Sequence, residues 1–140
     1  MPKQTDQTFP EISAAQMDMV LAFLPSFEKP GAIFGEWQTP AGHFPYYSYG
    51  PEVARFVAML YEENFVVSFD WPSWKEMALG YMDHPETLAE ADLLTLRKLL
   101  TTHVRNDRFV EGHLAGMLEN GHITAILRRL QTIRQAMPSG

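Results

Sequence analysis

The segment from His103 to His113 holds the densest group of side chains in the chain that could do chemistry. It reads His-Val-Arg-Asn-Asp-Arg-Phe-Val-Glu-Gly-His, so imidazoles, guanidiniums and carboxylates alternate with apolar residues. Polar groups beside a hydrophobic core need hydrogen-bond partners or a ligand, because burying them unpaired costs free energy. We therefore take five residues as candidate ligand-binding residues: His103, Arg105, Arg108, Glu111 and His113.

The two arginines indicate what kind of ligand this segment would take. Arg105 and Arg108 carry planar guanidinium groups, which present several N–H donors to an anion or to a carboxylate of a partner protein. The main hypothesis from the sequence is therefore a small helical interaction module or anionic-ligand-binding module. Its expected partner is a small anion or another protein.

A metal site is the first alternative. His103, Asp107 and Glu111 are four residues apart in turn, so one unbroken helix would place them on one face, with His113 or His122 nearby. The spacing matches no established metal motif, and the chain has no Cys. We predict no intrinsic metal, and no cofactor is indicated.

Catalysis is the second alternative. A histidine beside a carboxylate could do general acid–base work, so an enzyme of unknown chemistry that uses the cluster at 103–113 stays open. The sequence contains no nucleophile elbow, phosphate-binding loop or dinucleotide fingerprint. No residue is therefore assigned a catalytic role.

The third alternative is DNA binding through residues 110–136, which read as helix, glycine turn, helix, with Arg128, Arg129 and Arg134 on the second helix. The net charge of −6 argues against a general nucleic-acid binder. The charge is uneven, however: residues 1–70 carry three basic and nine acidic groups, whereas 97–140 carry seven basic and three acidic. Packing of the two ends against each other would neutralise both.

The elements that must position these residues are predicted to be helices. The chain is expected to be mainly α, a single domain over 1–140 with five to six helices and a small β-hairpin in 31–50, or a short strand or connector at 65–69. Capping boxes at Ser13, Ser73 and Thr87 predict three helix starts. Residues 1–12 and 138–140 are expected to be flexible.

Apolar residues at helical spacing place the helix that carries His103 from about Leu88 to about Asn106, followed by helices ending at Asn120-Gly121 and near Met137. Phe109 is expected to turn inward between the first two of these, with Arg108 and Glu111 paired around it. Gly112 and Gly116, one turn apart, indicate close approach of another backbone.

The run ADLLTLRKLLTTHVRNDRFVEGHL and the following Asn-Gly and amphipathic helix resemble the C-terminal signature of a bacterial family of small domains of unknown function. The resemblance is strongest over 91–130 and covers most of 45–135. It implies a bacterial, cytoplasmic protein and carries no activity with it.

Cell location and assembly follow from composition. No apolar run approaches the roughly 20 residues of a membrane span, and the first residues lack a secretory signal, so a cytoplasmic protein without a membrane partner is expected. The chain is rich in aromatic residues and Met for one small core. An interface would bury part of that surplus, so a homodimer is predicted.

Overall fold

The computed structural model describes residues 9–138, and their fold is mainly α, as predicted. In this part of the chain the elements follow in the order α1 (Ala14–Leu21), α2 (Leu24–Glu28), β1 (Gly35–Gln38), β2 (Tyr46–Tyr49), α3 (Pro51–Glu62), η2 (Pro72–Trp74), α4 (Lys75–Asp83), η3 (Pro85–Glu90), α5 (Leu93–Asn106), α6 (His113–Glu119) and α7 (His122–Ala136). The two η elements are short 3₁₀ helices.

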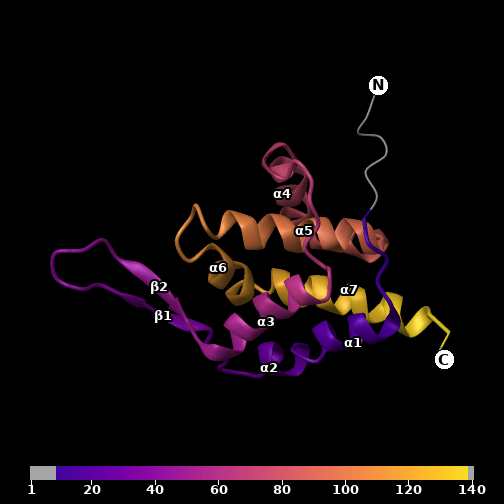
Figure 1. The fold of residues 1–140 in the computed structure, drawn as a ribbon, viewed down its shortest axis with the longest axis horizontal. Helices are drawn as coiled ribbons and strands as arrows, with labels where there is room; N and C mark the ends of the chain where they lie inside the picture. Colours follow the sequence, from indigo (N-terminus) through magenta and orange to yellow (C-terminus); the bar gives the residue numbers. More distant parts are fainter. Residues whose placement is uncertain (1–8, 139–140) are drawn as a thin grey trace.

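Helix α7 lies at the centre of the packing and contacts α1, α2, α5, α6 and η3. Its apolar stripe supplies four fully buried side chains: Ile123, Ile126, Leu127 and Leu130. The stripe repeats at the helical period, so one face of α7 is covered by its neighbours while the other carries polar residues. Figure 1 shows α5 above α7 and α1 below it.

The first predicted helix is present but divided. Ser13 caps α1 in a capping box: its hydroxyl accepts from Gln16 N at 3.2 Å, and the Gln16 side chain accepts from Ser13 N at 2.9 Å. Pro25 stands in the first turn of α2, where its missing N–H costs nothing, so the chain bends before it. This division explains why the described part has seven α-helices and not six.

The predicted flexible leader is partly packed, because Ile12 joins the hydrophobic core with 8% of its surface exposed. The same expectation also covers residues 1–8 and 139–140, which lie outside the described part of the chain.

The predicted β-hairpin in 31–50 is confirmed. Strands β1 and β2 pair antiparallel, with Gly35 opposite Tyr49 and Trp37 opposite Tyr47. The hairpin projects beyond the ends of the helices, and its loop forms the far left tip in Figure 1. Of the two alternatives for residues 65–69, a short strand or an extended connector, the structure shows the connector. The described residues form no strand there, and Val67 N donates to Thr101 Oγ1 at 2.9 Å.

Two predicted capping boxes are wrong. Ser73 lies inside η2 and donates its hydroxyl to Asp70 O, and Thr87 lies inside η3 and donates to His84 O. In both places the hydroxyl bonds back to a carbonyl and not forward to an orphan N–H. Helix α5 consequently begins later than predicted, where the Asp92 side chain accepts from Thr95 N at 2.8 Å.

Candidate functional site

Three histidines from three helices meet at one place. His103 lies in the fourth turn of α5 on its buried side, His113 opens α6 and His122 opens α7. His103 Nδ1 and His113 Nε2 are 3.0 Å apart and form a hydrogen bond, and the ring of His122 stands edge-on to that of His103 at 5.0 Å between centroids. The structure therefore brings together two of the candidate residues, His103 and His113, and His122, which the metal alternative names.

The histidine cluster is built to be uncharged. Burial, with the neighbouring His122 and His113 adding to it, lowers the pKa of His103 to about 3, and burial lowers that of His122 to about 4. The Nε2 atoms of both rings are buried without a hydrogen-bond partner among the described residues. A second ring proton would have no acceptor there, so the neutral imidazole is the stable form.

Metal ligation is not supported by this arrangement. Among residues 9–138, no three or more His, Cys, Asp or Glu side chains are grouped so that they could hold a metal ion. Asp107 and Glu111, which the helical spacing placed on one face with His103, lie beyond the end of α5 and bond elsewhere.

Asp107 and Glu111 hold the β-hairpin against α6. Asp107 Oδ1 accepts from Tyr49 Oη at 2.6 Å and from Leu114 N at 2.9 Å, and Tyr49 Oη accepts in turn from Ala115 N at 3.1 Å. Glu111 Oε2 accepts from Tyr47 N at 2.7 Å. Burial and the bond to Asp107 raise the pKa of Tyr49, so the phenol keeps its proton. These carboxylates serve the fold.

The turn between α5 and α6 corrects two predictions. Phe109 is 75% exposed and contacts the Trp71 ring at 5.9 Å between centroids, and does not turn inward. Arg108 is exposed and forms no ion pair with Glu111. The physical reason is that residues 107–112 form turns outside the helices, so helical spacing does not set their directions.

The candidate Arg105 packs over an aromatic ring, and the two glycines meet different surroundings. The Arg105 guanidinium lies 5.9 Å from the centroid of the Tyr61 ring. Gly112 adopts φ +76°, and a Cβ there would lie 2.9 Å from the Trp37 ring, so a side chain of the hairpin and not a helix backbone approaches it. Nothing lies within 4 Å of the Cβ position of Gly116, so the predicted close approach is wrong there.

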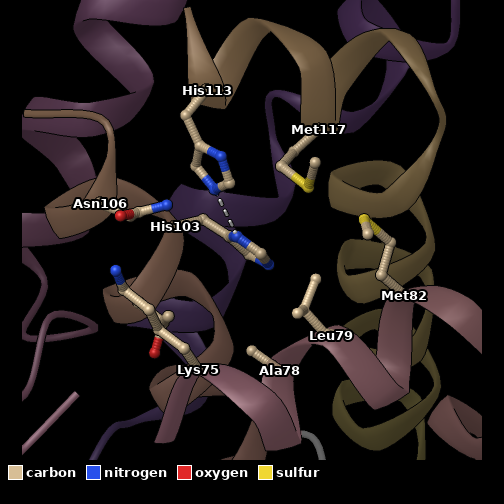
Figure 2. A pocket seen from close by; sticks show the side chains of 9 residues that line it. Lys75, Ala78, Leu79, Met82, His103, Asn106, His113 and Met117 are labelled. Atoms are coloured by element: carbon tan, nitrogen blue, oxygen red, sulfur yellow. Dashed lines mark hydrogen bonds between the residues drawn. The ribbon is translucent and has the colours of Figure 1, made fainter. Parts of the chain in front are cut away.

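A partly open pocket lies beside His103 and His113, and we call it the Lys75 pocket. Its volume is about 120 Å³. Its lining residues come from α4, α5 and α6: Lys75, Ala78, Leu79, Met82, Thr102, His103, Asn106, His113 and Met117. Figure 2 shows Lys75 and Asn106 at one end, and Leu79, Met82 and Met117 at the other. The pocket can take a small molecule with one polar and one apolar end.

Sequence reasoning missed most of this lining. Lys75, Leu79 and Met82 stand three to four residues apart on α4, so they share one helix face, and this spacing is readable from the sequence. Which helix that face packs against is a tertiary fact. The polar residues between α5 and α6 are crowded in the sequence, whereas those of α4 are not.

The arginines of α7 are occupied within the chain. The Arg128 guanidinium pairs with the Glu28 carboxylate, and Arg134 Nε donates to Asp18 Oδ1 at 2.9 Å. Arg129 Nε donates to Ala91 O at 2.8 Å. The basic C-terminal part thus neutralises acidic groups of α1 and α2. This arrangement argues against the helix-turn-helix alternative, which needs these arginines free for phosphates.

Comparison with known proteins gives a family. The model of a family of unknown function, DUF6508, matches residues 12–136. The chain belongs to this family. The match covers the whole described core of this DUF6508 protein, from Ile12 to the end of α7. No curated protein and no solved structure matches the chain. No helix in residues 9–138 is long and apolar enough to cross a membrane.

Proposed function

We propose that this protein is a binding module for a small anion, and that the anion occupies the Lys75 pocket. The observation that carries the proposal is the placement of Lys75 at one end of this mainly apolar pocket, beside Asn106. None of the ion pairs of the described residues involves Lys75. A cation next to a hollow, without a carboxylate to neutralise it, is placed to attract an anion.

The neutral histidines support binding over catalysis. A general base needs a pKa near the working pH, whereas burial holds the pKa of His103 far below neutrality. His103 Nδ1 is also bonded to His113. In our proposal the pair forms a fixed polar wall of the pocket.

Arg105 and Arg108 are not proposed to bind the small anion. Arg105 and Arg108 do not line the Lys75 pocket. Because Arg108 is exposed beside Phe109, it would contact a protein partner and not the small ligand. We further propose a bacterial, cytoplasmic setting and a homodimer, on the sequence features already given.

The proposal is tested by mapping backbone amide shifts while small anions are titrated into the protein. Phosphate, sulfate, acetate and benzoate span inorganic and organic anions. Binding at the Lys75 pocket should perturb residues of α4, α5 and α6 around Ala78, His103 and Met117. If none of these anions perturbs the pocket at concentrations up to tens of millimolar, the proposed function is wrong.

A further inference from the structure

The two ends of the Lys75 pocket differ in chemistry, and this difference narrows the class of ligand. We propose that the ligand is a monocarboxylate with one compact apolar body about the size of a benzene ring. This inference rests on the proposed function, since it names the anion that the pocket takes.

The charge of the site fits a single negative charge. Lys75 is the only lysine or arginine among the described residues that line the pocket. The two histidines of the lining add no positive charge at neutral pH, because burial lowers the pKa of both His103 and His113. A phosphate near its dianionic form, or a dicarboxylate, would enter with one charge unpaired, which is costly beside an apolar wall.

The apolar end of the pocket selects for an apolar body. Ala78 is buried, and Leu79, Met82 and Met117 face the same hollow in Figure 2. These side chains offer no strong hydrogen-bond donor, so a hydroxyl or charge at this end would lose its hydration without replacement. The two methionines are flexible and polarisable, so they can fit rings or branched chains alike.

The volume limits the size of this body. The pocket holds about 120 Å³, somewhat less than a buried apolar cavity of about 150 Å³ that holds benzene. A phenyl ring or a branched chain of similar size is therefore the upper limit for the apolar body, and it fits because the pocket is partly open. Acetate would leave the apolar end empty, and a long acyl chain or a nucleoside would exceed the pocket.

The polar end suits a carboxylate. Figure 2 places the Lys75 ammonium and the Asn106 side-chain amide on the same side of the histidine pair. Lys75 is exposed and its ammonium lies 5.4 Å from the centroid of the Trp71 ring, so the cation stays at the mouth. A carboxylate there keeps part of its hydration while it gains a charge-assisted hydrogen bond.

The experiment compares probes by isothermal titration and amide shift mapping at pH 7. The probes are benzoate, its neutral isostere benzamide, its doubly charged analogue terephthalate, acetate and inorganic phosphate. Benzoate should bind at the Lys75 pocket at least about tenfold more tightly than each of the others, because a lost charge-assisted contact, an unpaired second charge or an unfilled apolar end weakens binding by this order.

Two pairs of variants localise the effect. Lys75→Met should weaken benzoate binding at least about tenfold, whereas Lys98→Met, which alters a lysine stacked on the Phe69 ring, should not. Leu79→Trp should block the pocket, whereas Met77→Trp alters an equally exposed residue of α4 outside the lining and should leave binding unchanged. Both target residues are exposed, so neither change disturbs the core.

His113 supplies an independent readout. Burial lowers its pKa most, Asp107 opposes this and the Lys75 charge lowers it further. A carboxylate bound beside Lys75 should therefore raise the pKa of His113, which imidazole proton shifts report during a pH titration. The inference is overturned if phosphate, terephthalate or acetate binds the pocket as tightly as benzoate, or if Lys75→Met leaves benzoate binding unchanged. If anions bind the pocket without this preference, the proposed function stands and only the ligand class fails.

Discussion

The buried histidines predict that the protein loses stability when the pH falls from 7 to 5. His103 and His122 are each 5% exposed, and burial brings their pKa values from 6.5 to about 3 and about 4. Between pH 6.5 and about 4 the unfolded chain therefore binds a proton at each histidine and the folded chain does not. The free energy of unfolding must fall as the pH falls through this window.

The magnitude follows from the proton difference. Each histidine contributes about 1.4 kcal/mol per pH unit below 6.5. At pH 5 the cost is then about 2 kcal/mol for each ring and about 4 kcal/mol for the pair. This figure depends little on the folded pKa values, because both lie below pH 5.

Urea unfolding at pH 7 and pH 5 measures the difference. The variant His122→Gln removes one titrating ring, so its loss between the two pH values should be about 2 kcal/mol smaller than that of the wild type. His84→Gln is the control: the His84 side chain is 68% exposed, and the variant should keep the wild-type loss. Equal stability at the two pH values, or an undiminished loss in His122→Gln, would refute the idea of a neutral buried cluster.

Three further predictions concern the hairpin anchor, the turn before α6 and assembly. Tyr49→Phe removes the hydroxyl that joins Asp107 to Ala115 N and should lower the free energy of unfolding by about 1–3 kcal/mol in urea. Tyr46→Phe, on the same strand and 47% exposed, should change it little. Gly112→Ala should lower the free energy of unfolding by about 1–2 kcal/mol because its backbone is left-handed, and by more because the new Cβ meets Trp37. Gly42→Ala, also at positive φ but in open space, measures the backbone cost alone. Equal losses in the two variants would show that the Trp37 contact does not matter. Light scattering should give a homodimer, and a monomer over a wide concentration range would exclude it.

Much of the fold is readable from local sequence because local physics decides it. The helical stripe of α7 and the capping box at Ser13 act within a few residues, and both are present. Asn64 takes the left-handed conformation just after the end of α3, with φ 64°, as asparagine does more readily than most residues. Gly121 does so before α7.

The prediction fails where direction depends on tertiary contact. The apolar side chain of Phe109 predicts an inward position, yet it lies on a turn and contacts the Trp71 ring. Glu111 was expected to pair with Arg108 because they are close in sequence, but it bonds Tyr47 N, 64 residues away. No pattern within 103–113 indicates which strand packs against this segment.

The candidate site is also only partly readable from the sequence. His103 and His113 were found because polar groups crowd a core-facing segment, and the structure brings them within 3.0 Å. The sequence does not single out Lys75, because it is an exposed lysine on α4 that reaches the pocket only through the packing of that helix beside α5. The pocket arises from the packing of three helices, and each of them alone shows only part of it.

A crystal structure of the protein with benzoate at pH 7 tests the central claim most directly. We expect the carboxylate within hydrogen-bond distance of Lys75 Nζ or of the Asn106 side chain, with the ring among Leu79, Met82 and Met117. A pocket that stays empty at saturating benzoate would contradict this account. So would benzoate bound at Arg108 and absent from the Lys75 pocket.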